Sequence, residues 1–518
     1  MGGLDSGATG VINWRVVSVV LFVVFVQQLV TSLLYADSPF LIKTYFENID
    51  PTRIGHYAGF IVSMYGAGQI PGCLYWGWNA DKYGRKKSLI IVLLANAIVM
   101  TAFGLTNNFY VAITLRFVWG MTDGYLGICK TILTEVCSTD MIGLTTGLLF
   151  VSFAVASLLG PIFGGYLSDP ENLLHGLIEK IPYLKKVPFS VPLACCGLLC
   201  IICLLMVLVW VDETLPLEER QKQEALNQDM KRAMSGILRK RDRDDSLTAE
   251  EHVMLAMKEN NYIAMFKDPV IVLSVVLYGV EGLCQTTYDT LLPIWLSSSV
   301  LVGGFGFDKK DLAWIVSFVC PMQMATLVLF PIISKGWKAT VSVITLGVIQ
   351  TIVLAITPAV WLIRDLSLAT VVAVLFLVVS AFHILRSVLF KYPVTTIGPF
   401  LDETAQYVLI ANCCYQEFRA KAYCLSQVLA GLFRFIGPTL IPMLYSWSIE
   451  KPRSFPLDFG LSFYVLALLS LTCVLMAWAL PDSVNMTKGS LYNEVDAKME
   501  KRKKEKGMGV KEPLLESA

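Results

Sequence analysis

The chain has 518 residues, of which 55% are hydrophobic and only 16% are charged, and its mean hydropathy is +0.61. Soluble domains carry about 25% charged residues, so this composition excludes an ordinary soluble protein. The formal net charge of +1 argues against a nucleic-acid-binding protein, and the cysteines lie mostly inside apolar runs, which indicates free thiols rather than disulfides.

Twelve apolar segments are long enough to cross a bilayer as helices. Six lie in the first half of the chain, near residues 16–36, 56–76, 88–106, 109–129, 142–167 and 188–211. Six more lie in the second half, near residues 269–296, 312–333, 339–362, 367–392, 420–447 and 459–480. The pattern predicts an all-α membrane protein with twelve transmembrane helices in two pseudo-symmetric six-helix bundles, residues 16–211 and 269–480.

Three polar stretches remain outside these bundles. They are an N-terminus at 1–15, a central loop at 212–268 and a basic tail at 481–518, and all three are expected in the cytosol. The course of the chain over 392–418 is left open, because Pro393 and Pro399 interrupt the pattern and a second apolar piece follows.

The loop between the second and third segments is short and highly charged. Residues 77–87 read Gly-Trp-Asn-Ala-Asp-Lys-Tyr-Gly-Arg-Lys-Lys, and the four cations place this loop in the cytosol. Its spacing resembles the G-x-x-x-D-x-x-G-R-K signature of the major facilitator superfamily. That resemblance implies a gating loop with these residues: Gly77, Asp81, Gly84, Arg85 and Lys86.

Within this loop we expect Asp81 to pair with a cation or a helix end. We expect Arg85 to pair with a carboxylate across the interface between the halves, and Glu135 is a candidate partner. Such pairs can hold one face of a transporter shut. The simpler interpretation is that the cations only anchor the loop on the cytosolic side of the membrane.

Arg116 lies inside the segment 109–129, where an unpaired guanidinium is costly and therefore indicates function. The run from Arg116 to Gly120 resembles the R-x-x-x-G pattern of proton-coupled members of the superfamily. Asp123 follows seven residues later, on the same face of a continuous helix. We expect the two residues to form a proton-linked pair facing a cavity, with a structural ion pair as the alternative.

The segment 142–167 contains a run of small residues around a proline: Gly160, Pro161, Gly164 and Gly165. The run is similar to the antiporter motif of the superfamily, with Ala156 in place of its first glycine, and so implies antiport. Proline bends a helix and glycine permits close helix contact, which suits a hinge, although ordinary packing is the alternative. Gly437-Pro438 repeats the pattern 277 residues later, as a doubled six-helix unit would.

Further polar side chains lie inside the apolar segments. Glu281, Gln285 and Tyr288 share one helical face, and Glu281 is the candidate in the second half for binding a proton. The other candidates for a central cavity are Gln28, Asp37, Asp289, His383 and Arg386. The thiols at 196, 200 and 203 also share a face, but we interpret them as small buried hydrophobes, and we expect no resident metal and no cofactor.

Several motifs together resemble the zinc-induced facilitator-like branch of the drug:proton antiporters. They are Tyr57-Ala-Gly59, Trp76-Gly77, Arg116-Phe117, Glu135-Val-Cys137 and Asp212-Glu213-Thr214-Leu215. The resemblance implies export of metal chelates, potassium or auxin-related solutes. The chain departs from the branch at Lys87 and Asp212, where the branch has proline, and it lacks a Cys-Pro-Gly-Cys motif near the N-terminus, so the resemblance does not identify the substrate.

We therefore predict a secondary active transporter that exchanges protons for a small organic solute or a metal chelate, in export or organellar sequestration. An uncoupled facilitator and a solute-sensing membrane receptor remain as alternatives, and the motifs of the common enzyme classes are missing from the sequence. The expected partners are a small-molecule substrate, protons and the lipid bilayer, without nucleic acid. We expect a monomer in the plasma membrane or in a vacuolar or lysosomal membrane.

Overall fold

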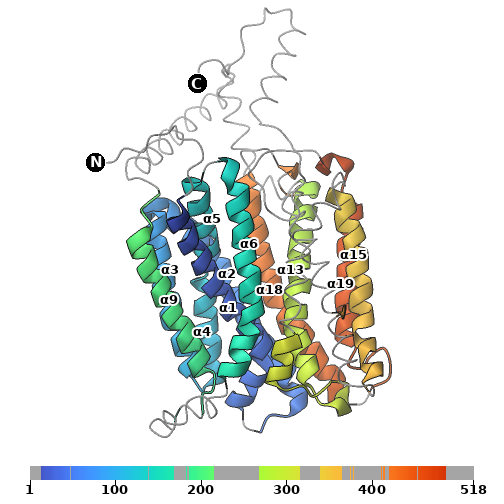
Figure 1. Ribbon diagram of the computed structural model, residues 1–518. Coiled ribbons are helices and arrows are strands. Elements are labelled where there is room, and N and C mark those ends of the chain that lie inside the picture. The colour runs from blue at the N-terminus through green and yellow to red at the C-terminus, as the bar shows by residue number, and fades with distance from the viewer. Residues whose placement is uncertain are drawn as a thin grey trace, which may run out of the picture.

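The computed structural model describes these residues: 13–46, 48–137, 139–168, 183, 186–214, 268–315, 339–364, 374, 377–378, 410, 412–414, 419–451 and 453–485. Within them every regular element is a helix (Figure 1). Most of the expected segments 367–392 and 312–333 lies outside the described residues. So do the stretch 392–409, nearly all of the central loop and most of the tail.

The helices fall into two groups along the chain. The first half forms α1 (Trp14–Tyr45), α2 (Ile54–Tyr83), α3 (Arg85–Leu105), α4 (Phe109–Met121), α5 (Tyr125–Val136), α6 (Thr139–Leu167) and α9 (Ser190–Trp210). The second half forms α13 (Pro269–Ser297), α15 (Ala339–Ile356), α18 (Arg419–Glu450) and α19 (Leu461–Trp478). Short 3-10 turns accompany them: η1 (Pro51–Arg53), η3 (Val300–Val302), η4 (Thr357–Ile363) and η6 (Asp482–Asn485).

Seven helices in the described residues are long and apolar enough to cross a membrane. They are Trp14–Tyr45, Arg85–Leu105, Ser190–Trp210, Pro269–Ser297, Val343–Ile363, Leu425–Glu450 and Leu461–Trp478. Hydropathy alone places most of these elements within a few residues, because about 20 apolar residues are needed to cross the hydrocarbon. Their outward faces are apolar as well, with Ile98, Leu198 and Val209 all exposed, as expected of surfaces that contact lipid.

Side chains in the connecting turns fix where the helices begin. Asp50 accepts hydrogen bonds from the backbone and the hydroxyl of Thr52, which lead into η1 and α2, and these bonds lower the pKa of Asp50. Asp268 accepts the backbone N–H of Val270 at 2.9 Å and caps α13, with Pro269 at the first helical position.

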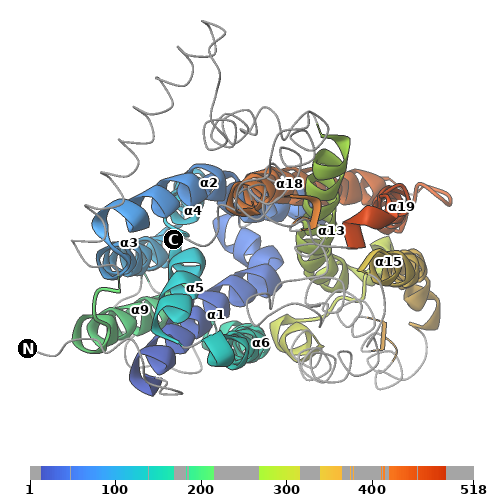
Figure 2. The ribbon, with the colours of Figure 1, turned by 90° about the horizontal axis from the view of Figure 1, so that it is seen from above.

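The two halves lie side by side and meet along α2 and α18 and along α1 and α13 (Figures 1 and 2). Within each half, the helix that carries the Gly-Pro pair packs on the first helix of that half. A Cβ at Gly160 of α6 would overlap Ser32 of α1, and a Cβ at Gly437 of α18 would overlap Thr287 of α13. The weak sequence echo between the halves therefore corresponds to equivalent contacts in the fold.

Candidate functional site

The turn between α2 and α3 brings together a cluster of charges. Gly84 has a φ of 105°, which glycine adopts without strain, and a Cβ there would overlap the carboxylate of Glu213. Arg85 donates from Nε to Glu135 Oε1 at 3.1 Å, and its Nη1 lies 3.2 Å from Asp81 Oδ1. Arg85 is the cation that pairs with Asp81, and Glu135 is its partner as expected. Both pairs join residues of the first half, so these contacts do not cross the interface as the sequence led us to expect.

The first residues of the central loop form hydrogen bonds with this cluster. Glu213 accepts the first backbone N–H of α3 at 2.7 Å and so stabilises the N-terminus of that helix. Thr214 donates its hydroxyl to Glu135, and Lys86 donates to the carbonyl of Leu208 at 3.1 Å. The end of α9 is thereby joined to α3 and α5.

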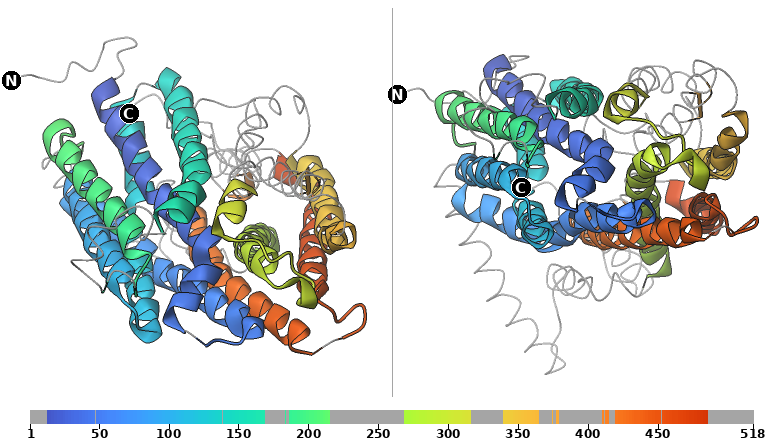
Figure 3. Two further views of the ribbon diagram at one scale, coloured as in Figure 1. Left: turned by 60° about the horizontal axis from the view of Figure 1, so that its bottom comes forward. Right: turned by 90° about the horizontal axis from the view of Figure 1, so that it is seen from below.

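At the opposite end of α2, the helix packs closely on α18 (Figure 3). A Cβ at Gly59 would overlap the backbone carbonyl of Pro438, and the backbone N–H of His56 donates to Ser446 at 3.0 Å. The contact continues to the middle of α2, where a Cβ at Gly431 would lie 3.1 Å from Ile70. We call this contact the α2–α18 seam.

The same face of α2 continues beyond the seam toward the charged turn. Cys73, Gly77 and Asp81 follow Ile70 at intervals of three or four residues, and all three are exposed among the described residues. The described residues leave the space within 4 Å of a Cβ at Gly77 unoccupied. The two halves are therefore in contact along one length of α2, and this face of its other end is uncovered by the described part of the chain.

Asp123 lies in a break between α4 and α5, and the continuous helix that its spacing predicted does not form. α4 ends at Met121, whose carbonyl accepts a hydrogen bond from Trp76 Nε1 at 2.8 Å. A Cβ at Gly124 would overlap the indole ring of Trp76. Because the indole occupies this position and binds the carbonyl end of α4, Arg116 and Asp123 do not share one helical face.

Residues of both halves surround Asp123. Gln69 Nε2 donates to its carboxylate at 2.5 Å, and the hydroxyl of Tyr65 also hydrogen-bonds to it. The cations whose charge acts on it are Arg434 of α18 and Arg116 of α4. Asp123 is partly exposed, so its carboxylate is accessible to solvent, and its charged neighbours come from both halves of the chain.

Arg116 is only 1% exposed. Its guanidinium carbon lies 4.6 Å from the ring centre of Tyr65 and 4.8 Å from that of Trp119, so two aromatic faces stabilise the charge. Among the described residues, no hydrogen-bond acceptor contacts its three guanidinium nitrogens, and no ion pair with Asp123 forms within 4 Å. Arg116 is thus a buried cation that is held by aromatic rings and lacks a bonded acceptor in the described part of the chain.

The four hinge candidates lie in α6, with Pro161 inside the helix. Gly160 and Gly164 let α6 approach α1 closely, and a Cβ at Gly164 would overlap the carboxylate of Asp37. A Cβ at Gly165 would lie 3.1 Å from the carbonyl oxygen of Lys309, which belongs to the second half. One helix therefore contacts both halves through its small residues.

Lys309 extends from the second half into the first. Its Nζ lies 3.4 Å from Ser168 Oγ and 5.0 Å from the ring centre of Phe189. The charge of Lys309 acts on Asp37, which is only 2% exposed. Lys309 Nζ also lies 5.9 Å from the ring centre of Phe40. This cluster, which we call the Lys309 contact, joins the halves at the same end of the molecule as the turn that leads into α2.

The other predicted cavity residues are distributed among different helix contacts. Glu281 is buried and accepts from Gln350 of α15 at 3.1 Å, inside the second half. Tyr288 is buried on the same face of α13, and Gln28 donates to Ser157 at 2.8 Å between α1 and α6. Gln285 and Asp289 are partly exposed on α13, whereas His383 and Arg386 lie outside the described residues.

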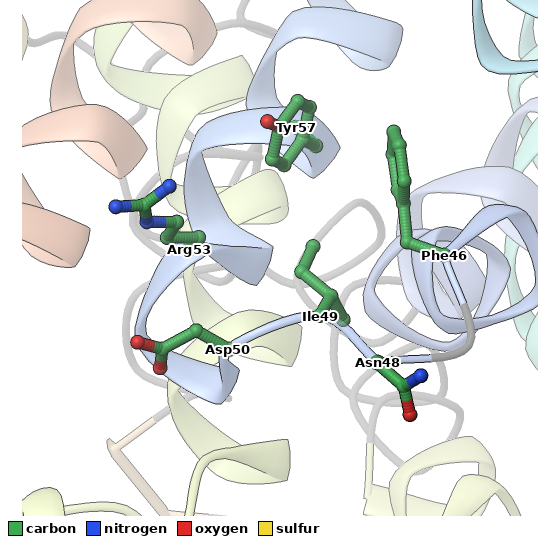
Figure 4. A pocket seen from close by; sticks show the side chains of 6 residues that line it. All are labelled: Phe46, Asn48, Ile49, Asp50, Arg53 and Tyr57. Atoms are coloured by element: carbon green, nitrogen blue, oxygen red, sulfur yellow. The ribbon is translucent and has the colours of Figure 1, made fainter.

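A pocket of about 560 Å³ lies beside the entry to α2 (Figure 4). Its lining residues are Phe46, Asn48, Ile49, Asp50, Arg53 and Tyr57. Tyr57 precedes Tyr65 by eight residues, which is roughly 12 Å along a helix, so the pocket is separate from the group around Asp123.

The sequence did not identify Tyr65, Gln69 and Arg434 as partners of Asp123. All three are polar residues inside apolar segments, which was the available signal. Pairing by helical spacing considers one helix at a time, whereas these partners come from α2 and α18.

Three comparisons place the chain among known proteins. A sequence profile of the Major Facilitator Superfamily matches residues 20–401. A probable peptide/nitrate transporter of Arabidopsis thaliana is 24% identical over 80% of this chain and 79% of its own length. Protein ZINC INDUCED FACILITATOR-LIKE 1 of the same plant is 24% identical over 77% of each chain, which confirms the resemblance to that branch.

Solved structures show the same fold. The D-xylose–proton symporter superposes with a TM-score of 0.63 at 14% identity, covering 92% of this chain and 99% of its own. A bacterial homologue of the human lysosomal transporter Spinster, in an inward-facing conformation, gives a TM-score of 0.61 at 12% identity, with coverage of 91% and 97%. The arrangement of two helical bundles expected from the sequence is confirmed.

Proposed function

The chain belongs to the major facilitator superfamily, and from this premise we propose that it is a proton-coupled antiporter of a small organic solute or a metal chelate. It is a multi-pass integral membrane transporter and not an enzyme. The observation that supports coupling most directly is the place of Asp123, a partly exposed carboxylate between cations from the two halves.

Protonation of Asp123 would change the forces between the halves. Ionised Asp123 attracts Arg434, which is attached to the second half through α18. A proton on Asp123 removes that attraction and also leaves Arg116 without a nearby negative charge. Proton binding and the relative position of the halves are linked in this proposal, as coupled transport requires.

The uncovered end of α2 supports a gate at the charged turn. In the opposite conformation, the face formed by Cys73, Gly77 and Asp81 would be covered by α18, extending the seam that now ends near Ile70. The Lys309 contact would open at the same time at the other end. The small residues of α6, which touch both halves, would permit this rocking motion.

One proton can supply the energy needed. A charge that crosses 100 mV releases about 2.3 kcal/mol. Since each tenfold concentration difference requires about 1.4 kcal/mol, one proton supports a solute gradient of roughly 40-fold.

The test uses the full chain in proteoliposomes that contain a pH-sensitive dye. A proton gradient is imposed, and three probes are offered in turn: ethidium as an organic cation, a zinc–histidine chelate, and citrate as an organic acid. Antiport predicts that one probe class produces proton movement in the direction opposite to the probe. Probe flux without proton movement would instead support an uncoupled facilitator.

Two variants assign the proton to the proposed site. Asp123→Asn should reduce proton-driven flux to background while exchange of probe for probe continues, because the amide cannot carry the proton. Arg116→Met keeps the packing between Tyr65 and Trp119 and should also lose proton-driven flux, without loss of thermal stability, because no bonded partner is left behind. Asp311→Asn, which changes an exposed aspartate in the first turn of the helical stretch that begins at Lys309, is the matched control. Unchanged coupled flux in Asp123→Asn would contradict the proposal.

A further inference from the structure

A chain of buried polar side chains leads from α9 to the helix break. Gln27 of α1 donates from Nε2 to Cys200 Sγ at 3.4 Å, and it accepts from Asn96 Nδ2 at 3.2 Å. The hydroxyl of Thr122 donates to Asn96 Oδ1 at 2.5 Å. Three helices and the break are thus joined through consecutive hydrogen bonds.

The two amides in this chain of hydrogen bonds lie in the interior of the helical bundle. Asn96 is fully buried and Gln27 is 2% exposed, and both lie on helices apolar enough to cross the membrane. A primary amide at such a depth is costly unless its donors and acceptors are used. Asn96 uses both ends of its amide, one toward α1 and one toward the break, so it has a defined orientation.

Thr122 is the residue directly before Asp123. Its hydroxyl also lies 2.8 Å from the carbonyl of Trp119, a bond that any helix-terminal threonine can make within its own helix. The bond to Asn96 differs because it connects the break to α3, a separate helix. It therefore limits how far residues 122–124 can move relative to the body of the first half.

We propose that Asn96 and Thr122 are positioning residues, whose hydrogen bond fixes the α4–α5 break and so holds Asp123 in line with Gln69 and Tyr65. The proposal rests on the role of Asp123 as the proton carrier. Trp76 stops α4 from the side of α2, and Asn96 holds the break from the side of α3.

Several charged or titratable groups face Asp123 and must stay unchanged in any test. They are Tyr65 of α2, Arg116 of α4, Tyr125 of α5 and Arg434 of α18. Neither Asn96 nor Thr122 is titratable, so substitution of either one alters the position of the carboxylate without changing the surrounding charge.

Infrared difference spectroscopy on the full chain in lipid provides a readout that needs no solute. A change of pH alone is applied, and the carbonyl stretch of protonated carboxylic acids is recorded. The part of this band that disappears in Asp123→Asn belongs to Asp123, and its midpoint is followed in each variant. Loss of alignment with Gln69 and Tyr65 weakens bonds that favour the ionised form, so Thr122→Val should move the midpoint upward by about 0.5 pH unit or more.

Three further variants separate positioning from general structural damage. Thr122→Ser keeps the hydroxyl, so the midpoint of the Asp123 band should equal that of the unsubstituted protein. Asn96→Leu should shift the midpoint in the same direction as Thr122→Val. Thr114→Val removes a hydroxyl that bonds within α4 to Tyr110 and should leave the midpoint unchanged.

Different failures have different meanings. If Asp123→Asn removes a band but Thr122→Val and Asn96→Leu leave its midpoint in place, the positioning role is wrong and the proton site stands. If Asp123→Asn removes no band, the proposed proton carrier is itself wrong.

Discussion

Gly160 illustrates how a single hydrogen atom in place of a side chain determines a helix contact. A Cβ at this position would overlap Ser32 and would lie 2.5 Å from the backbone carbonyl of Leu29, which cannot rotate away. We predict that Gly160→Ala lowers the free energy of unfolding by about 1–3 kcal/mol, as overpacking does. Thermal denaturation in detergent measures the loss.

Gly127 provides the control for this change, because the described residues leave the space around its Cβ position open. Gly127→Ala lies in α5 and should stabilise by up to about 1 kcal/mol through helix propensity. Equal melting temperatures for the two variants would mean that α6 and α1 are less closely packed than described.

The charged side chains show what the sequence could predict at this scale. Glu135 was predicted as a partner of Arg85, and a cation was predicted for Asp81, because a loop motif with short spacing leaves few possible partners. The expectation that Arg85 pairs across the interface was wrong, since both of its carboxylate partners belong to the first half. The pairing of Arg116 with Asp123 was not found, because helical spacing assumes that the helix continues. The break depends on Trp76 of another helix, and no local pattern encodes that contact.

At the scale of whole elements, the helical stretch that begins at Lys309 contacts the first half through several residues, and Lys309 is the one whose charge acts on Asp37. Lys309→Gln removes the charge that acts on Asp37 while keeping most of the side-chain length. We predict that conformations with this end open become roughly fivefold more populated, the effect of about 1 kcal/mol. Spin labels at Asn48 and Leu301, one in each half, report the separation by double electron–electron resonance.

The exposed Cys73 is first replaced by serine so that labelling stays specific. Lys186→Gln is the matched control, since Lys186 is an exposed lysine of the first half just before α9. An unchanged distance distribution in Lys309→Gln would show that the Lys309 contact does not hold this end closed.

Helix positions followed from hydropathy where each helix crosses the membrane independently. The segment 269–296 became α13 at Pro269–Ser297, and the segment 188–211 became α9 at Ser190–Trp210. The segment 109–129 was divided into α4 and α5, because Gly120 and Gly124 allow close approach of α2 at this point. Apolar composition is the same on both sides of the break, so hydropathy could not locate it.

At the scale of the whole molecule, a substitution on the uncovered face of α2 should leave the present conformation intact and obstruct the one in which α18 covers this face. Gly77→Leu places a side chain where the described residues leave room, so thermal stability should stay within about 0.5 kcal/mol. The same side chain would obstruct closure of α18 on α2, and turnover in proteoliposomes should fall at least about tenfold. Leu74→Ala, on an exposed position nearby, is the control. Normal turnover in Gly77→Leu would exclude closure over this face.

The pairing of the two halves was only partly accessible from sequence. The repeated Gly-Pro pair indicated equivalent helices, and the contacts of Gly160 and Gly437 agree with it. The helices that meet across the halves are selected by close backbone contacts such as that of Gly59 with Pro438. The sequence could not identify these helices, because small residues occur on many other helix faces as well. Glu281 is likewise buried within the second half beside Gln350, which donates a hydrogen bond to it and is 69 positions away in the sequence.

The depth of the α4–α5 break has an electrical meaning. Asn96 is the twelfth of the 21 residues of α3, so Thr122 and Asp123 lie close to the middle of the membrane. A proton that reaches Asp123 from either surface crosses about half of the transmembrane field, or roughly 1.2 kcal/mol per 100 mV. Voltage should therefore act on both the binding and the release of the proton, and neither step would be electrically silent.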